Sequence, residues 1–516
     1  MKIERTKNAA RNIFFGIVLK AYQIIVPFLM RTAMIYLMGV QYLGLNSLFT
    51  SILQVLNLAE LGVGSAMVYS MYKPIAEDGE MVLCALLKLY RKYYRVIGLV
   101  IAVVGCMFTP FIPKLISGDV PSGINVYILY LLNLGATVLS YWLFAYKNSI
   151  LQAYQRTDIV SKVSLIISTV QYALQLFVLF FFHNYYFYVI IMLATQVLKN
   201  IVTAFVATMM YPNYKPVGKL PKSMVMEINC RIRDLFTAKL GGTIVNSADT
   251  IVISAFLGLS MLTVYQNYYY IMNAVMGFVM IIFSACIAGI GNSLVVETEE
   301  KNYYDFKRLV FLIMWIMTIC ISCFACLFQP FMKIWVGEEY LLDMNVVILL
   351  CVYFYLYLIN HLACVYKDAG GIWHEDRFRP LIGGLVNVAL NLIMVNHIGI
   401  YGIVLSTILS YILVATPWLI HNLFKLVFKC SPKEYIGMVG RGAVISAIVT
   451  MLCYALCNVL PGQGMIELFI NGFVCFVVSN VALIFAYRHN PMYLPFLELL
   501  DRVTQKRFHF IVERLK

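Results

Sequence analysis

The chain has 516 residues, of which 62% are hydrophobic and only 12% are charged, and its formal net charge is +14. A soluble protein has an apolar fraction nearer one half, whereas here apolar runs long enough to cross a hydrocarbon core of about 30 Å recur from end to end. This composition excludes an ordinary soluble protein and, because short alternating segments are absent, a membrane β-barrel as well, and it predicts an all-α integral membrane protein.

We predict fourteen membrane-spanning helices that follow one another through most of the chain. In chain order their approximate bounds are 12–38, 41–68, 95–116, 123–145, 160–182, 187–211, 237–258, 264–294, 309–330, 345–366, 380–396, 399–421, 436–459 and 466–487. They suggest five parts, which are an N-terminal six-helix lobe (1–211), a basic cytoplasmic linker (212–236), a C-terminal six-helix lobe (237–424), helices 13 and 14 (425–487) and a cytoplasmic amphipathic tail (488–516).

The distribution of positive charge supports these spans. With a cytoplasmic N-terminus, nearly all of the 39 Lys and Arg lie in cytoplasmic segments or at their flanks. The exceptions are Lys114 and Lys333 on the outer side and Lys20, Arg31 and Lys199 within spans. This asymmetry follows the positive-inside rule and predicts that both termini are cytoplasmic. It also explains the net charge without a nucleic-acid partner.

The first span contains two cations in the stretch KAYQIIVPFLMR. Lys20 and Arg31 are eleven residues apart, so on a helix they return to nearly the same side, with Pro27 and Gln23 close to that side. A cation near a helix centre costs about 2.5–3.5 kcal/mol on insertion scales. Such residues usually face water or a partner, and we therefore predict a hydrated polar stripe on this helix.

The second span carries Glu60, with Asn57 and Asn46 on roughly the same side. Depth within the spans makes Lys20 a candidate ion-pair partner for Glu60. Further along the chain, Lys199 and Asp249 lie near the middle of their spans, and Asp249 could pair with Lys199 or with Arg31.

Two interpretations of these charges remain open. In one, the charges are buried pairs that hold the helix bundle together. In the other, three cations outnumber two acids in a hydrated lumen, which would attract an anion, with phosphate as the first candidate. The second interpretation assigns Arg31, Lys20 and Lys199 to binding of the anion, Glu60 and Asp249 to ion pairing or coupling, and Gln23, Asn46 and Asn57 to the polar lining.

The two predicted lobes show a faint internal repeat. Leu37-Met38-Gly39 corresponds to Phe256-Leu257-Gly258, and the residues that follow correspond at the same offset. A duplicated six-helix unit keeps its orientation in the membrane, an arrangement known from transporters. Chance similarity between apolar helices is the alternative.

Other motifs predict packing or anchoring rather than chemistry. Cys320, Cys323 and Cys326 have regular spacing but lie in an apolar helix without His or carboxylate neighbours, so we predict packing and no metal site. The tail 488–516 predicts an amphipathic helix on the inner leaflet. No P-loop motif is present for ATP hydrolysis, nothing suggests a cofactor, and the short external loops offer no catalytic domain, which argues against an enzyme.

Three blocks of the sequence resemble a known family. They are RNIFFG…PFLMRTAMIYLMGVQYLGLNSLFTSILQVLNLAELGVGSAMVYSMYKPIAE, the segment AFLGLSMLTVYQNYY after Asp249, and GGIWHEDRFRPLIGGLVNVALNLIMVNHIGIYGIVLSTILS. The pattern is similar to bacterial polysaccharide flippases of the Wzx type, which belong to the polysaccharide transport family of the MOP superfamily, together with MATE exporters and lipid II flippases.

This resemblance implies a fold and a function. The expected fold has two six-helix lobes of the MATE and lipid II flippase type, and the last two helices (436–487) would form a groove for a lipid tail. The expected function is transfer of undecaprenyl-diphosphate-linked oligosaccharide units from the cytoplasmic to the outer leaflet of the bacterial inner membrane, for O-antigen, lipopolysaccharide or capsule, by alternating access around a cationic cavity. Arg31 lies in the family's early PFLxR-like block and would contact the anion.

The resemblance also implies partners. These are the lipid-linked oligosaccharide, membrane lipid, and polymerase and chain-length proteins. Two alternatives remain, namely a MATE-like ion-coupled exporter of small molecules and a membrane enzyme of glycan assembly. A site for small cations should be rich in acids, whereas the predicted lumen has surplus cations.

Overall fold

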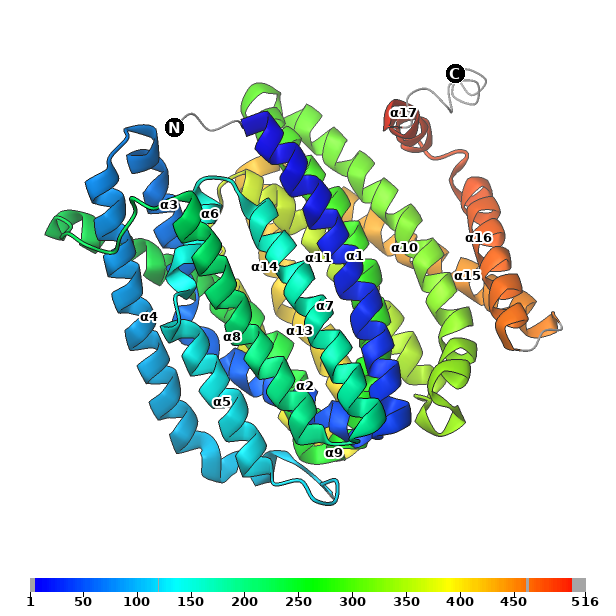
Figure 1. The fold of residues 1–516 in the computed structure, drawn as a ribbon. Coiled ribbons are helices and arrows are strands. Elements are labelled where there is room, and N and C mark those ends of the chain that lie inside the picture. The colour runs from blue at the N-terminus through cyan, green and yellow to red at the C-terminus, as the bar shows by residue number, and fades with distance from the viewer. Residues whose placement is uncertain (1–4, 119, 461–463, 504–516) are drawn as a thin grey trace. The chain divides into compact units, whose positions relative to one another are not determined.

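The protein is built from α-helices joined by short connections, as a computed structural model shows (Figure 1). The structure describes residues 5–118, 120–460 and 464–503. Contacts divide the chain into two compact units, residues 1–263 and residues 264–516, and the division falls within the longest helix. We describe each unit by itself.

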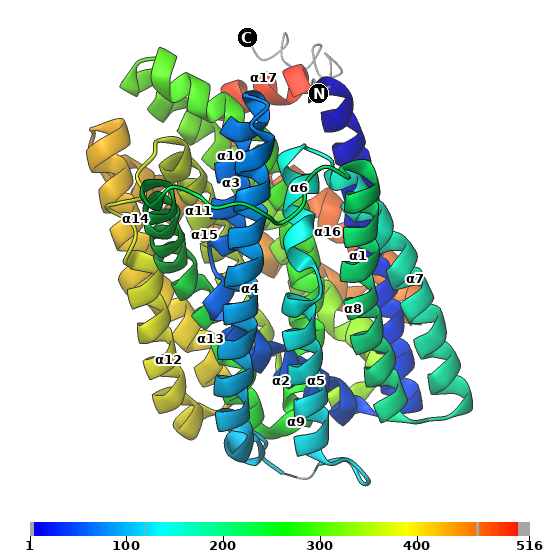
Figure 2. The ribbon, with the colours of Figure 1, turned by 60° about the vertical axis from the view of Figure 1, so that its left-hand side comes forward.

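The helices of the first unit pack both on neighbours in the chain and on helices far away in the sequence. α1 packs on α7, α7 on α8, α8 on α5, and α5 on α4, while α3 packs on α4 and α6 (Figure 2). In chain order the elements are α1 (Arg5–Leu37), α2 (Val40–Leu56), η1 (Asn57–Glu60), α3 (Val63–Ala76), α4 (Glu80–Phe108), η2 (Thr109–Leu115), α5 (Val126–Trp142), η3 (Ala145–Lys147), α6 (Asn148–Ala153), α7 (Thr157–Phe181), α8 (Tyr185–Met210) and α9 (Lys222–Val296), which continues into the second unit.

The second unit is organised around α10, which packs on α11, α15, α16 and α17. After the end of α9 its elements are α10 (Glu299–Val336), η4 (Glu338–Tyr340), α11 (Met344–Ala369), α12 (Arg379–Ile398), α13 (Ile400–Ser410), η5 (Tyr411–Ala415), α14 (Thr416–Leu423), η6 (Phe424–Phe428), α15 (Lys433–Val459), α16 (Gly464–Tyr487) and α17 (Tyr493–Val503).

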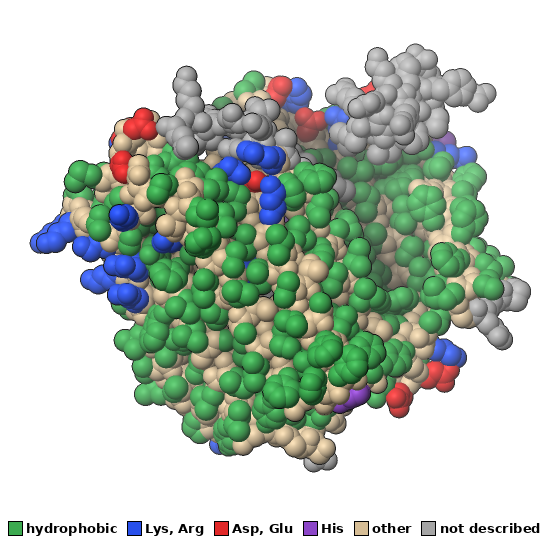
Figure 3. All heavy atoms as spheres, viewed as in Figure 1, with side chains coloured by type: hydrophobic (Ala, Val, Ile, Leu, Met, Phe, Trp, Pro, Cys, Tyr) green, Lys and Arg blue, Asp and Glu red, His purple; other side chains and the backbone are tan. Residues whose placement is uncertain are grey.

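Hydrophobic side chains cover the outer face of the first unit. Figure 3 shows them over α1, α7, α8 and α5, with Lys and Arg gathered toward one end of these helices. Phe177, Phe181 and Phe205 are among the exposed aromatic residues. Exposed apolar area of this extent is typical of a surface that contacts lipid. The protein is therefore a multi-pass membrane protein.

Each of the fourteen predicted spans lies in helical structure, but the helices are fewer than the spans. Within the described residues, eleven helices are long and apolar enough to cross a membrane, or twelve if the bent pair formed by α5 and η3–α6 is one span. Two features account for the difference from fourteen. α9 contains two predicted spans, and the predicted span 41–68 is broken at η1 into two shorter helices.

Two glycines form corresponding corners between helices. Gly39 separates α1 from α2 with φ 109° and ψ 160°, and Gly258 interrupts α9 with φ 87° and ψ 173°. Both angles lie in a region that side chains with a Cβ avoid. The two corners lie close together, because a Cβ on Gly44 would be 2.5 Å from the Leu259 carbonyl oxygen and Thr263 Oγ1 donates to Val40 O at 2.7 Å. The matching conformations support the predicted repeat at this point.

The C-terminal helix α17 packs its aromatic side chains on protein. Phe496 is 2% exposed and its ring lies 5.0 Å from that of Trp315 in α10, and Tyr493 stacks on the same tryptophan. In the described residues, the apolar side of the predicted amphipathic tail is therefore covered partly by α10 instead of lipid. Residues 504–516 of that predicted tail lie outside the described residues.

A candidate polar site in the first unit

Glu60 is held by buried tyrosines. Tyr94 donates its hydroxyl to Glu60 Oε1 at 2.7 Å, and Tyr141 donates to Oε2 at 3.0 Å. Tyr90 donates to the Tyr94 hydroxyl at 2.7 Å, which extends the chain of hydrogen bonds. Tyr90 and Tyr94 lie on α4, Tyr141 lies on α5, and all three are buried. The carboxyl group thus joins three helical elements in the interior of the unit.

The break in the second predicted span places Glu60 at this position. The α-helix ends at Leu56, and η1 and Gly62 follow before α3 begins. Gly62 has φ 88°, and a Cβ there would lie 2.7 Å from the Cβ of Leu235 on α9. A side chain at Gly64 would lie 3.1 Å from the Tyr90 hydroxyl. Glycine is therefore favoured at Gly62 by both conformation and space, whereas a Cβ at Gly64 would only require the Tyr90 side chain to shift by a few tenths of an ångström.

Asn57 adds an unsatisfied acceptor at the start of η1. Its Oδ1 is buried and has no hydrogen-bond partner among the residues that the structure describes. Since buried polar atoms are usually paired, such an acceptor marks a place where water or a ligand hydroxyl can bind. Asn57 and Glu60 are three residues apart, and side chains with that spacing lie nearly above one another on a 3₁₀-helix.

The cations of α1 lie along one long helix that carries Pro27 within it. Lys20 and Gln23 are exposed, whereas Arg31 is half-buried and lies beside Tyr188 of α8. Tyr22 shares a hydrogen bond of 3.0 Å with Thr169, which ties α1 to α7.

The candidate pair of Lys20 and Glu60 is not formed. In the described part of the chain, no ion pair joins the two residues, and tyrosine hydroxyls occupy both oxygens of the Glu60 carboxylate. Two neutral donors can satisfy a carboxylate without the cost of holding a long lysine side chain in one conformation.

The remaining candidates lie on other helices of the same unit. Lys199 is half-buried on α8 and Asp249 is half-buried on α9, and no ion pair joins them among the described residues. Asn46 is half-buried on α2, where its backbone carbonyl oxygen accepts from Thr50 Oγ1 at 2.7 Å. The predicted charges thus lie on four elements of the first unit, namely α1, η1, α8 and α9.

Sequence reasoning missed the three tyrosines. Tyr90 and Tyr94 are four residues apart, so they share a face of α4. This spacing predicts that the two tyrosines lie next to each other. Tyr141 comes from a different helix, and nothing in the sequence links it to Glu60.

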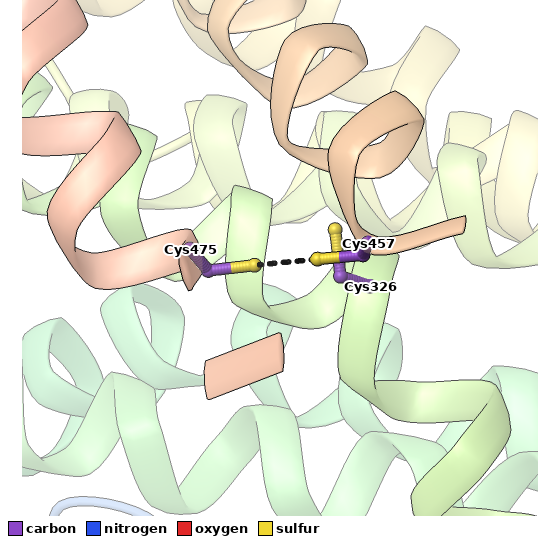
Figure 4. A group of neighbouring side chains, drawn as sticks. All are labelled: Cys326, Cys457 and Cys475. Atoms are coloured by element: carbon purple, nitrogen blue, oxygen red, sulfur yellow. Dashed lines mark hydrogen bonds between the residues drawn. The ribbon is translucent and has the colours of Figure 1, made fainter. Parts of the chain in front are cut away.

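A cluster of thiols lies in the second unit. Cys326 of α10, Cys457 of α15 and Cys475 of α16 have sulfur atoms within 4.8 Å of one another, and the Cys457 and Cys475 sulfurs are 3.9 Å apart (Figure 4). All three are buried. Of the three cysteines predicted to pack, only Cys326 belongs to this group, which joins α10 to α15 and α16.

The fold is that of known membrane transporters. The inward closed conformation of the lipid II flippase MurJ superposes with a TM-score of 0.67 at 15% identity, covering 92% of this chain and 99% of that chain. An inward-facing multidrug resistance MATE transporter of the MOP superfamily superposes with a TM-score of 0.61 at 13% identity. The match covers 79% of this chain and 98% of the transporter. A MOP superfamily transporter from Pyrococcus furiosus superposes with a TM-score of 0.51 at 12% identity, covering 82% of this chain and 97% of the transporter.

No protein-family model matches the chain, and no curated protein matches its sequence. The structural similarity establishes the MurJ- and MATE-like fold that the sequence predicted.

Proposed function

We propose that the protein is a flippase that moves undecaprenyl-diphosphate-linked oligosaccharide units from the cytoplasmic to the outer leaflet of a bacterial inner membrane. The observation that carries the proposal is the fold, which matches nearly the full length of a lipid II flippase and 92% of this chain. The resemblance of three sequence blocks to polysaccharide flippases supports the same function. The product would supply O-antigen or capsule assembly, with polymerase and chain-length proteins as partners.

The charges of α1 suit such a substrate. A diphosphate headgroup cannot enter hydrocarbon unaided, because burying an unpaired ion costs many kcal/mol. Arg31 and Lys20 lie on a helix that is otherwise apolar enough to span the membrane. Fixed cations at membrane depth can replace part of the hydration of the two phosphates while the prenyl tail stays in lipid. We assign Arg31, Lys20 and Lys199 to this role.

Net transport requires a driving force, and Glu60 and Asp249 are our candidates for coupling to an ion. Glu60 is bound by hydroxyl donors and has no cationic partner among the described residues, so a coupling ion can bind there without displacing a lysine or arginine. Alternating access between two lobes would then move the headgroup from one side to the other.

A MATE-like exporter of small molecules is the second candidate, because an inward-facing MATE transporter shares the fold. The two functions differ in the charge of their substrates. A site for organic cations would rely on Glu60 and Asp249, whereas a site for a diphosphate would rely on the cations. A strain lacking the protein should lose surface polymer and keep its drug susceptibility if the flippase proposal holds.

The experiment is export of surface polymer in a deletion strain that carries variants of the protein. We expect Arg31→Ala to abolish export and Arg31→Lys to retain part of it, because lysine keeps the charge but loses bidentate phosphate binding. Arg233→Ala, at an exposed arginine of α9, is the matched control and should export normally. Normal export by Arg31→Ala, at equal amounts of inserted protein, would contradict the assignment of Arg31.

A further inference from the structure

A basic pocket lies at one end of α4 in the first unit. It has a volume of about 470 Å³ and lies between α4 and the segment that leads into α9, which passes across α4 near α3 (Figure 2). Its lining residues are Ala85, Lys88, Leu89, Arg91, Lys92, Arg95, Gly218, Lys219, Leu220 and Val225.

The walls of the pocket are fixed to each other. Tyr93 donates to Asn229 Oδ1 at 2.7 Å and the Cys84 thiol donates to the Asn213 carbonyl at 3.7 Å, so two contacts tie α4 to the crossing segment and to α9. Gly218 has φ 94°, and a Cβ there would lie 3.3 Å from the Cβ of Ala85. Glycine thus allows the segment to approach α4 closely, which shapes the pocket.

Five cations and no acid line the pocket. Lys88, Lys92 and Arg95 are exposed, and Arg91 is half-buried near the Tyr146 hydroxyl. Among the described residues, none of the five cations takes part in an ion pair. Like charges held this close repel one another unless an anion is present, and a concave basic site concentrates anions from solution.

The same helix provides a surface for lipid tails. Directly after Arg95, the side chains of Val96, Leu99 and Val103 are 51%, 55% and 49% exposed. This part of α4 belongs to an apolar helix long enough to cross a membrane. A lipid could therefore place its headgroup among the cations while its acyl chains follow the exposed valines and leucine. Basic pockets at the cytoplasmic ends of spans suit anionic lipid headgroups.

We propose that this pocket binds the headgroup of a membrane lipid that carries two phosphate groups. Two phosphates are preferred to one because a single phosphodiester neutralises only one of the five charges. Two lipids share this chemistry, namely a diphosphatidyl glycerolipid and a polyprenyl diphosphate. The inference does not depend on the proposed function, although a polyprenyl diphosphate would make the pocket a first binding place for the flippase substrate.

The test is lipid binding by the full-length protein, purified in detergent and titrated with each probe in mixed micelles, with bound lipid counted by native mass spectrometry. The probes are diphosphatidylglycerol, undecaprenyl diphosphate, phosphatidylglycerol and inorganic pyrophosphate. The variant combines Lys88→Gln, Lys92→Gln and Arg95→Gln. The matched control combines Lys73→Gln, Lys222→Gln and Arg233→Gln, which removes the same number of exposed cations outside the pocket.

We expect at least one of the two diphosphate lipids to bind about tenfold more tightly than phosphatidylglycerol. The pocket variant should weaken that binding on the order of 100-fold, since each basic residue near a membrane surface contributes about 1 kcal/mol. The control should bind normally, and raising the salt concentration should weaken binding. The lipid that binds identifies the source of the headgroup.

Three results would overturn the proposal. Equal binding of both diphosphate lipids by the wild type and the pocket variant would show that the pocket is not the site. Equal binding of phosphatidylglycerol would remove the preference for two phosphates. Equally tight binding of inorganic pyrophosphate would show a site for free anions. A thermal unfolding curve for each variant checks that the protein remains folded, and loss of lipid binding would leave the polymer-export test unaffected.

Discussion

At the scale of residues, Glu60 forms hydrogen bonds with tyrosines. The sequence had suggested an ion pair with Lys20 instead, because the two residues lie at similar depths in their spans. Two tyrosine hydroxyls bind its two oxygens, and a third tyrosine extends the network. A hydrogen bond to a charged group contributes about 1.5–3 kcal/mol, and an unsatisfied buried partner costs a similar amount. The network therefore sets both the position of Glu60 and the cost of disturbing it.

Removing one donor tests this network. We expect Tyr141→Phe to lower the free energy of unfolding by about 1–3 kcal/mol, because Glu60 Oε2 loses its donor. The same substitution in a Glu60→Gln background should cost less, and thermal unfolding in detergent measures both values. Tyr93→Phe, which removes a less buried hydroxyl bonded to Asn229, is the control on α4. Equal losses in the two backgrounds would show that Tyr141 does not act through Glu60.

At the scale of elements, glycine corners break helices that the sequence presents as continuous. The predicted span 41–68 contains such a break because Gly62 takes a positive φ beside α9. Hydropathy averages over such a break, so it predicts one span where the chain forms two helices and a 3₁₀ turn. In α9 the predicted boundary at residue 258 coincides with the observed kink, since Gly258 takes a conformation that no helix contains.

Substitution of Gly62 tests the role of the break. Gly62→Ala should destabilise the protein by more than 1 kcal/mol, because the new Cβ needs a left-handed backbone and contacts Leu235. Gly135→Ala on α5, where nothing lies within 4 Å of the added Cβ, is the control and should be neutral or stabilising by up to about 1 kcal/mol. A melting temperature for Gly62→Ala equal to that of the wild type would contradict this role.

An ion pair between α10 and α15 should make the stability of the second unit depend on pH. Lys307 bonds Glu434 at 2.9 Å, and this hydrogen bond and charge lower the pKa of the Glu434 carboxyl. A carboxyl group with a lowered pKa in the folded state stabilises the fold above its unfolded pKa, and this contribution disappears as the pH falls through the folded value. Because the Glu434 side chain is 58% exposed, we expect the ion pair to contribute at most about 1 kcal/mol to the free energy of unfolding.

Thermal unfolding between neutral and acidic pH measures this contribution. Glu434→Gln should reduce the difference in stability between the two conditions, whereas an unchanged pH profile would show that the pair contributes nothing.

At the scale of the whole molecule, the sequence predicted the fold class and the placement of the spans in helices. Apolar length and charge asymmetry carry this information, because each span must cross the same thickness of hydrocarbon. The partners of Glu60 could not be predicted, since Tyr94 and Tyr141 reach it from two other helices. The cluster formed by the thiols of Cys326, Cys457 and Cys475 was not predicted for the same reason, because the three cysteines come from three helices.

The central claim is that this protein carries a lipid diphosphate across the membrane, and transfer in a reconstituted bilayer tests it most directly. Proteoliposomes would contain the purified protein and a fluorescent undecaprenyl-diphosphate oligosaccharide, and a membrane-impermeant quencher would report the fraction of label in the outer leaflet. We predict that the wild type moves the label from one leaflet to the other and that Arg31→Ala does not. Transfer by the wild type no faster than in protein-free vesicles would contradict the account.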